Sequence, residues 1–247
     1  MAPSAASPSS PVALVTGAAG GLGRAAVALL RSRGMRVMAT DIALAAIPCT
    51  DPGFGMASLD VTDEAAINDC VARVCSEFGR LDHVVHLAGR AGSGPLDAVT
   101  RQQWDDVMEV NLTSAFLIAR AVHAPLARSR GSLVLTSSTN GLNGGSALSG
   151  PAYAVAKAGL INLTRYLARE WAPEGIRVNC LAPGPVDTPM VTGRFAPEVL
   201  ARLGASVPLG RIGEPRHIAH AIGYLTSADA EFVTGTVMNL SGGLVMD

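Results

Sequence analysis

Strand-like and helix-like segments alternate along almost the whole sequence, and this order constrains the fold more than any other feature. Strands that alternate with helices form a parallel sheet with helices on both faces. The sequence therefore predicts an α/β fold with a doubly wound, mostly parallel, seven-stranded Rossmann-type sheet. Strand patterns occur at residues 11–17, 35–41, 55–62, 81–89, 131–138, 176–184 and 235–243, and helix patterns at 22–33, 63–78, 101–127, 152–172 and after Glu214.

Local residue types add details to this outline. We expect Thr62 or Asp63 to cap the helix at 63–78, and the helix at 101–127 to be interrupted near Pro125. The 247 residues suit one domain, because no repeat or long linker divides them. Residues 1–10 are expected to form a disordered tail, and residues 11–247 a single Rossmann-type domain with a small substrate lid near 186–207.

Composition argues against several kinds of partner. The 19 Lys and Arg residues balance the 20 Asp and Glu residues, so there is no electrostatic case for nucleic acid or an anionic membrane. No apolar run approaches the ~18 residues of a membrane span, and the first ten residues do not resemble a signal peptide. The cysteines form no Cys-x-x-Cys pair, which predicts reduced thiols, no metal site and a cytoplasmic protein. They are Cys49, Cys70, Cys75 and Cys180.

The stretch "LVTGAAGGLGR" joins the first strand to the first helix. Gly17, Gly21 and Gly23 would allow a tight turn and a close approach of the backbone to a pyrophosphate. The free N–H groups at the start of the following helix favour the same ligand. Glycines of this kind also serve packing alone, and the pattern leaves both explanations open.

Asp41 favours the dinucleotide explanation. It ends the second strand 18 residues beyond Gly23, where an acidic residue binds the hydroxyls of an adenosine ribose. Its carboxylate would repel a 2′-phosphate, and Gly20 and Ile42 occupy positions where basic partners of that phosphate are usual. These features predict NAD as the cofactor. Asp60, after the third strand, is either an adenine contact or an ordinary turn residue.

A second group of residues predicts acid–base chemistry. Tyr153 and Lys157 are four positions apart on a predicted helix, so they share one face. A neighbouring ammonium is expected to lower the pKa of a phenol, which makes the pair a credible proton donor and acceptor. Ser138 ends the preceding strand, and Asn111 lies on an apolar helix stripe. A chance surface pair and a satisfied core amide are the alternatives for Tyr153–Lys157 and Asn111.

These residues together resemble the short-chain dehydrogenase/reductases that have a single Rossmann-type domain. The segment "TGAAGGLG" matches the family's Thr-Gly, three residues, Gly-x-Gly motif, and "YAVAK" its Tyr-x-x-x-Lys motif. The segment "RVNCLAPGPVDTPM" matches the region after the sixth strand. The resemblance implies that the catalytic residues are Asn111, Ser138, Tyr153 and Lys157. It implies cofactor contacts from Gly17, Gly20, Gly21, Leu22, Gly23, Asp41, Asp60, Val61, Ala88, Gly89, Tyr153, Lys157, Pro183, Gly184, Val186 and Thr188.

The same resemblance implies a reaction that interconverts a secondary alcohol and a ketone. Tyr153 would exchange a proton with the substrate oxygen, and Lys157 would lower the tyrosine pKa and bind the nicotinamide ribose. Ser138 would orient the substrate, and Asn111 would hold a water that links Lys157 to solvent. Two features depart from the family. "HLAG" replaces Asn-Asn-Ala-Gly, so His86 is expected to be a packing residue, and the loop before Tyr153 is about two residues longer than usual.

The substrate is predicted less firmly than the reaction. No cation is evidently placed to hold an anion, although Arg194 or Arg202 could turn inward, so we expect a neutral compact alcohol or diol. A 3-oxoacyl reductase, acting on acyl carrier protein or CoA thioesters, is the alternative, and a nucleotide-sensing protein is a remoter one. We expect a homotetramer, with a dimer as second choice, formed by helices rich in small residues. Those residues are Ala115, Ala119, Ala152, Ala156 and Ala158.

Overall fold

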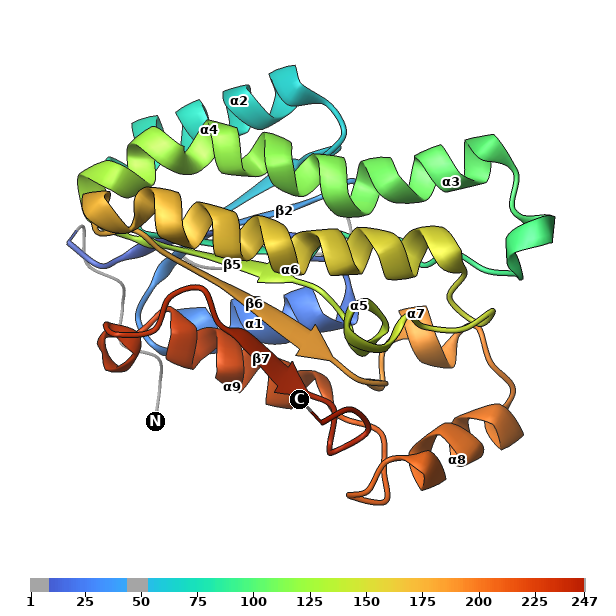
Figure 1. Ribbon diagram of the computed structural model, residues 1–247. Helices are drawn as coiled ribbons and strands as arrows, with labels where there is room; N and C mark the ends of the chain where they lie inside the picture. The colour runs from blue at the N-terminus through green and yellow to red at the C-terminus, as the bar shows by residue number, and fades with distance from the viewer. Residues whose placement is uncertain (1–8, 44–52, 247) are drawn as a thin grey trace.

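A seven-stranded sheet forms the centre of the computed structural model, which describes residues 9–43 and 53–246 (Figure 1). The strand order is β3-β2-β1-β4-β5-β6-β7, and every pairing between neighbours is parallel. The predicted fold class is confirmed. The strands are β1 Val12–Thr16, β2 Arg36–Asp41, β3 Phe54–Ser58, β4 His83–His86, β5 Ser132–Thr136, β6 Arg177–Pro183 and β7 Val237–Leu240.

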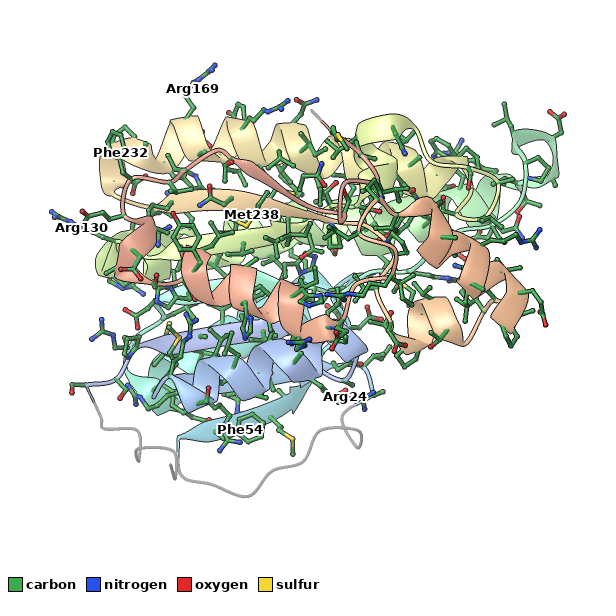
Figure 2. All side chains as sticks on the ribbon, turned by 90° about the horizontal axis from the view of Figure 1, so that it is seen from below. Arg24, Phe54, Arg130, Arg169, Phe232 and Met238 are labelled. Carbon is green, nitrogen blue, oxygen red and sulfur yellow. The ribbon has the colours of Figure 1, made fainter. Side chains whose placement is uncertain are left out.

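Helices cover both faces of this sheet. Helices α1 and α9 pack together on one face, seen from below in Figure 2, and α2, α4 and α6 lie on the other (Figure 1). The helices are α1 Gly21–Ser32, α2 Glu64–Phe78, α3 Arg101–Met108, α4 Ser114–Ser129, α5 Thr139–Asn143, α6 Pro151–Trp171, α7 Pro189–Thr192, α8 Pro197–Ser206 and α9 Pro215–Leu225. Short 3-10 turns lie at Leu96–Ala98, Ala172–Glu174 and Ala228–Ala230, and a π-helical turn at Glu109–Thr113.

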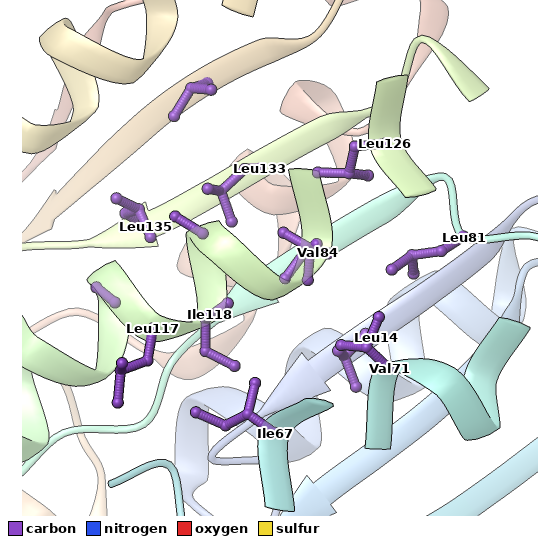
Figure 3. Close-up of a cluster of buried hydrophobic side chains, with 14 of the residues drawn as sticks. Leu14, Ile67, Val71, Leu81, Val84, Leu117, Ile118, Leu126, Leu133 and Leu135 are labelled. Carbon is purple, nitrogen blue, oxygen red and sulfur yellow. The ribbon is translucent and has the colours of Figure 1, made fainter. Parts of the chain in front are cut away.

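Each face of the sheet has its own apolar core. Under α2, α4 and α6, side chains such as Leu14, Ile118 and Leu133 are completely buried (Figure 3). Under α1 and α9, Val15 and Ile222 belong to a second cluster. Strands covered on both faces need apolar residues at successive positions, which explains the continuous apolar runs of β1 and β5.

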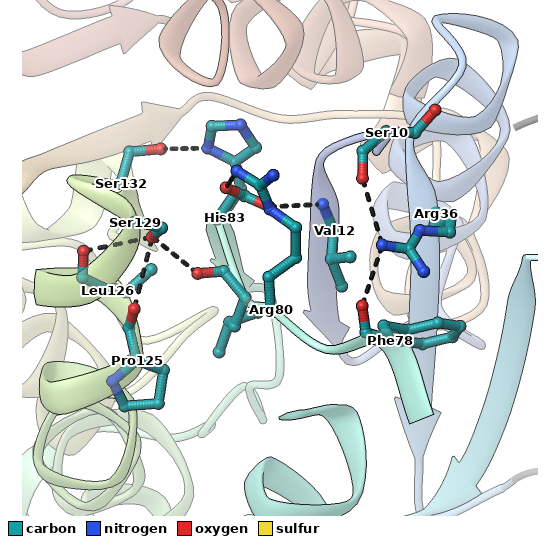
Figure 4. Close-up of polar contacts among 12 residues, drawn as sticks. Ser10, Val12, Arg36, Phe78, Arg80, His83, Pro125, Leu126, Ser129 and Ser132 are labelled. Carbon is teal, nitrogen blue, oxygen red and sulfur yellow. Dashed lines mark hydrogen bonds and ion pairs between the residues drawn. The ribbon is translucent and has the colours of Figure 1, made fainter. Parts of the chain in front are cut away.

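Polar contacts fix the strands at the edge where they begin (Figure 4). The Asp82 carboxylate accepts hydrogen bonds from the Val12 N–H and from Arg80 Nε, both at 2.8 Å. His83 Nδ1 lies 2.9 Å from Ser132 Oγ, which links β4 to β5. None of these contacts lies at the opposite edge of the sheet, where the strands end, so that edge is available for a functional site.

The helix at 101–127 differs from its prediction. Pro125 does not interrupt α4, which continues to Ser129. A proline here removes one helical hydrogen bond, and the last turn is held by the Ser129 hydroxyl, which donates to the Leu81 carbonyl at 2.7 Å. The irregularity lies earlier instead, at the π-helical turn Glu109–Thr113.

The structure also decides between the two residues that were expected to cap α2. Asp63, rather than Thr62, caps α2 by accepting a hydrogen bond from the Ala66 N–H.

The run Arg101–Ser129 is long and apolar enough by composition to cross a membrane, with a mean hydropathy of 1.2. Half of the most apolar stretch of this run is buried inside the protein, and α4 packs on α2 and β4 as a core helix does. Residues 1–8 of the predicted tail and Cys49 lie outside the described residues.

Candidate active site

The glycine-rich turn lies where β1 meets α1. Gly17 has a φ of +66°, which residues with side chains rarely adopt. A Cβ atom on Gly17 would lie 2.7 Å from the Ala88 backbone nitrogen, and one on Gly23 would overlap the Gly17 carbonyl oxygen. Packing alone therefore requires glycine at both positions. The same tight turn leaves a backbone cradle at the amino end of α1, where the free N–H groups suit phosphate oxygens.

The segment after β6 lies against this turn. A Cβ atom on Gly21 would be 2.8 Å from Thr188 Cγ2, so these two predicted cofactor residues are neighbours. Gly20 is the residue that precedes α1, and Leu22 lies in its first turn. The fold therefore brings two segments that carry predicted cofactor residues, around Gly21 and Thr188, to one place.

Asp41 ends β2 beside the glycine-rich turn. Its carboxylate accepts hydrogen bonds from the Ala19 N–H at 3.0 Å and the Ala43 N–H at 2.9 Å. Arg36 stands at the opposite end of β2, where it donates to the Phe78 carbonyl. Ile42 is 71% exposed. Within the described residues no cation pairs with Asp41, so no ion pair there neutralises its charge beside the glycine-rich turn.

The other predicted cofactor residues fall into three groups. Asp60 is exposed and accepts hydrogen bonds from the Thr62 N–H and hydroxyl, which lower the pKa of its carboxyl. Val61 and Val186 are buried in the apolar clusters, so only their backbone groups are available to a cofactor. The remaining four lie at the edge where the strands end: Ala88 and Gly89 follow β4, Pro183 is the last residue of β6, and Gly184 comes directly after it.

Lys157 lies inside the protein on α6. It is the only lysine in the sequence, it is 4% exposed, and its Nζ donates to the Thr136 carbonyl at 2.8 Å. Burial lowers the pKa of Lys157 to about 8, because a low-dielectric surrounding disfavours the ammonium. Nζ lies 5.4 Å from the centre of the Tyr153 ring. The helical spacing has therefore placed the two side chains together, as predicted.

The pKa of Tyr153 differs from the expectation. Burial raises it, while a hydrogen bond with Ser138 and the charge of Arg194 lower it. Lys157 is not among these causes in the chain alone, so the expected lowering by its ammonium is not found. Ser138 is the residue that caps α5, and its Oγ also accepts from the Asn140 N–H at 3.2 Å. The serine hydroxyl is thus fixed beside the phenol.

Asn111 lies in the π-helical turn, which rotates its side chain out of the regular helix register. Its Nδ2 donates to the carbonyls of Arg90 at 2.7 Å and Val107 at 2.8 Å. A Cβ atom on Gly89 would be 2.9 Å from Asn111 Oδ1 and 3.4 Å from Lys157 Nζ. The amide is therefore satisfied within the protein, and its oxygen also borders the space next to the lysine. The sequence did not indicate that Arg90 contacts Asn111, because Arg90 makes this contact through backbone atoms and not through its side chain.

His86 connects the glycine-rich turn to this π-helical turn. The Ser114 hydroxyl donates to the Val110 carbonyl at 2.6 Å, so its oxygen accepts from His86 Nε2, 3.0 Å away. The unprotonated Nδ1 then accepts from the Thr16 hydroxyl at 2.8 Å. Burial, aided by the charge of Lys157, lowers the pKa of His86 to about 3, so the ring is neutral at physiological pH. His86 is thus more than the packing residue expected from the sequence, because its two ring nitrogens tie the two turns together.

A pocket of about 190 Å³ opens beside Tyr153 and Ser138. Its lining comes from the ends of β5 and β6, the loop before α6, and α7 with the residues after it. Arg194 lines this pocket, whereas Arg202 does not. The expectation that no cation is evidently placed at the site therefore needs correction. The direction of the arginine depends on the fold around α7, which the sequence did not reveal.

Comparison with known proteins identifies the family. A sequence profile described as Enoyl-(Acyl carrier protein) reductase matches residues 17–245. The chain belongs to the short-chain dehydrogenase/reductase family. This dehydrogenase/reductase is therefore an oxidoreductase acting on CH–OH groups, in a family that uses nicotinamide dinucleotides.

Three relatives indicate the range of activities among similar proteins. The chain is 40% identical over 240 residues to cis-4-hydroxycyclohexanecarboxylate dehydrogenase from Sinomonas cyclohexanicum, covering 94% of this chain and 95% of the relative. It is 37% identical over 241 residues to 3-oxoacyl-[acyl-carrier-protein] reductase FabG from Vibrio cholerae serotype O1, covering 95% and 97%. The solved aldohexose dehydrogenase of Thermoplasma acidophilum is 27% identical, with a TM-score of 0.86 and coverage of 96% and 94%.

The single lysine makes the buried ammonium directly measurable. With isotope-labelled lysine, the dehydrogenase should give one side-chain NMR signal that titrates near pH 8 rather than near 10.5. Between pH 8 and pH 10.5, Lys157 therefore binds fewer protons in the folded protein than in the unfolded chain. Lys157→Met should therefore raise the free energy of unfolding below pH 8, by about 3 kcal/mol as an order of magnitude. This advantage should shrink as the pH rises from 8 to 10.5, and a midpoint near 10.5 would contradict the burial argument.

His86→Leu should uncouple the two turns that it joins. The variant leaves the buried Thr16 hydroxyl without its partner, at a cost of roughly 1–3 kcal/mol, so its melting temperature should fall. His83→Leu is the matched control, because His83 lies on the same strand but at the opposite edge of the sheet. Both variants should lose stability, and only His86→Leu should weaken NADH binding in a fluorescence titration. Equal NADH affinity in the two variants would show that His86 does not support the site.

Proposed function

We propose that this protein is an NAD(H)-dependent oxidoreductase that interconverts a secondary alcohol and a ketone on a compact substrate with an acyl or carboxyl group. The observation that supports this best is the meeting of Tyr153, Ser138 and Lys157 beside one pocket, next to the glycine-rich turn. Bound NAD would accept a hydride from the carbinol carbon or return one to the ketone. The remaining chemistry belongs to the side chains of this chain.

Tyr153 and Ser138 would act on the substrate oxygen. Both line the pocket, so a hydroxyl placed between them can donate to one and accept from the other. During reduction the phenol of Tyr153 donates its proton to the substrate oxygen. During oxidation the phenol would first pass its proton toward Lys157, and the resulting phenolate would take the hydroxyl proton. Burial holds the pKa of Tyr153 above its ordinary value in the chain alone, so the phenol starts as a proton donor. Ser138 stabilises the phenolate by its hydrogen bond.

Lys157 and Asn111 would move the proton onward. Above its pKa of about 8, Lys157 is neutral and can accept a proton at Nζ. Lys157 Nζ and Asn111 Oδ1 both lie close to Gly89, and a water molecule bound by these two groups would link the lysine to solvent. The proton can then pass from Tyr153 toward solvent without moving the backbone. Thr136 keeps the lysine in place through its carbonyl.

Asp41 supports NAD rather than NADP. Its carboxylate is already oriented by two backbone N–H groups, so it can accept from ribose hydroxyls without rearrangement. A 2′-phosphate at the same place would face a negative charge with no nearby cation among the described residues, which costs binding free energy. The negative charge of Asp41 at the end of β2 therefore supports the proposed preference for NAD.

Two substrate classes fit the acyl or carboxyl requirement. A hydroxycycloalkane carboxylate matches the compact pocket and the name of the relative from Sinomonas. A 3-oxoacyl thioester matches the name of the relative from Vibrio and the profile description, and it is the second candidate. The neutral alcohol or diol expected from the sequence is the weakest of the three, because Arg194 lines the pocket.

We also propose a homotetramer of this chain in the cytoplasm, with residues 186–207 as the substrate lid. Four of the five alanines expected at the helix interface are buried within the chain, so they cannot form it. The outer surfaces of α4 and α6 instead expose Phe116 at 47% and Tyr166 at 63%, beside a groove of about 450 Å³. The outer edge of β7 and the fully exposed Phe232 offer a second contact (Figure 2).

The cofactor proposal has a direct kinetic test. Wild-type enzyme should turn over faster with NAD(H) than with NADP(H). The double variant Asp41→Ala, Ile42→Arg should shift the ratio of kcat/KM toward NADP(H), because it removes the repelling charge and adds a cation. Tyr153→Phe is the control for chemistry: it should bind NADH normally and lose ~10²–10⁴-fold in turnover. Equal or better wild-type activity with NADP(H) would refute the preference.

The assembly proposal is tested by light scattering. Phe116→Glu with Tyr166→Glu should convert a tetramer into smaller species, because like charges would face each other across the proposed contact. Leu96→Glu is the control, since Leu96 is 70% exposed but lies away from both helices. A wild-type monomer at micromolar concentration, or a tetramer unaffected by the double change, would contradict the proposed interface.

A further inference from the structure

Arg194 differs chemically from everything else around the substrate pocket. The other lining residues are apolar or carry uncharged hydroxyl and amide groups, and among the described residues Arg194 is the one charged member of the lining. It follows α7 within the segment 186–207. Its charge reaches far enough to lower the pKa of Tyr153. A single uncompensated cation therefore faces the same space as the reacting groups.

The guanidinium keeps unused hydrogen-bond donors. One terminal nitrogen, Nη2, donates to the Gly92 carbonyl at 2.8 Å and lies 3.4 Å from the Leu148 carbonyl. Nε and Nη1 have no partner among the described residues, and no carboxylate there forms an ion pair with Arg194. The Phe195 ring, 5.7 Å from the guanidinium carbon, covers part of the group. Two carbonyls and a ring hold the arginine, and a planar two-point fork becomes available when Nη2 gives up its longer contact, at 3.4 Å to Leu148.

We propose that Arg194 binds a free carboxylate of the substrate, so that the substrate is a compact hydroxy or keto carboxylate rather than a thioester. This inference depends on the proposed alcohol–ketone chemistry at Tyr153. A carboxylate matches the fork in a two-point, charge-assisted contact, which a neutral ester or thioester cannot make. It would pair with Nη1 and the second N–H of Nη2, replacing the long contact to Leu148 while the shorter bond to Gly92 persists. A carrier-linked acyl chain would instead meet the segment that these bonds hold over the pocket.

The position of Arg194 also selects for geometry. The substrate must span the distance from Arg194, which would hold its carboxylate, to Ser138 and Tyr153, which would hold its reacting oxygen. Apolar residues also line the pocket, including Met190, Val191 and Leu203, and they suit a hydrocarbon ring or short chain. A ring that carries both a hydroxyl and a carboxylate would offer one group to each end.

The test compares matched probes with NAD. 4-Hydroxycyclohexanecarboxylate, its methyl ester and cyclohexanol differ in the group that Arg194 would hold. Wild-type kcat/KM should favour the carboxylate over the ester by about tenfold to a hundredfold, the range expected for a charge-assisted contact. Arg194→Ala should remove that preference, measured as the ratio of kcat/KM for carboxylate and ester within the same variant, so that any effect of the lost charge on Tyr153 cancels. Cyclohexanecarboxylate, which has no hydroxyl, should inhibit cyclohexanol oxidation in wild type and not in Arg194→Ala.

Control variants separate the possible outcomes. Arg194→Lys should keep part of the preference, because it retains the charge and loses the fork. Arg202→Ala, on the same segment but outside the pocket lining, should behave as wild type. Equal kcat/KM for carboxylate and ester, or a preference that survives Arg194→Ala, would overturn the carboxylate anchor alone. If neither the three alcohols nor the matching ketones and a 3-oxoacyl thioester turn over, the proposed chemistry fails, and the inference about Arg194 fails with it.

Discussion

The parallel direction of all the strands is the constraint on which the rest of this structure depends. Because every strand ends at the same edge, the segments after β1, β4, β5 and β6 are brought into one region although they are far apart in the sequence. The order of the strands reverses between β1 and β4, where α1 and α4 leave on opposite faces, and ligands of such sheets bind at this point. The glycine-rich turn, Ser138 and the segment that contains Arg194 are neighbours for that reason.

A site of this kind requires polar groups inside an apolar structure, and each is stabilised by a specific partner. The Lys157 ammonium donates to a strand carbonyl, the Asn111 amide to two carbonyls, and His86 joins two hydroxyls. An unpaired buried polar group is costly, so these contacts fix the side chains as well as satisfying them. The π-helical turn that orients Asn111 is itself held through Ser114 and His86. Stability and catalytic geometry therefore depend on the same hydrogen bonds.

The substrate end of the pocket is built differently. Its walls come from short helices and loops, and its only charged lining residue among the described residues is held by backbone carbonyls. The residues proposed to be catalytic lie on α6, in the π-helical turn and directly after β5, where the core positions them. Arg194 is positioned by loops that can differ between relatives without disturbing the sheet. This division explains how one reaction type can act on acyl thioesters in one relative and on a hydroxycyclohexanecarboxylate in another.

The sequence by itself determined the strand and helix order, the glycine-rich turn, the Asp41 position and the Tyr153–Lys157 spacing. These features depend on periodicity and on neighbours within a few residues, which a sequence displays directly. The tertiary structure decided the rest. The π-helical turn at Asn111, the path of α4 through Pro125, the link made by His86 and the inward position of Arg194 depend on contacts between segments distant in the chain. The pKa of Tyr153 belongs to the same group, because burial sets it, and burial is a property of the folded chain and not of the residue.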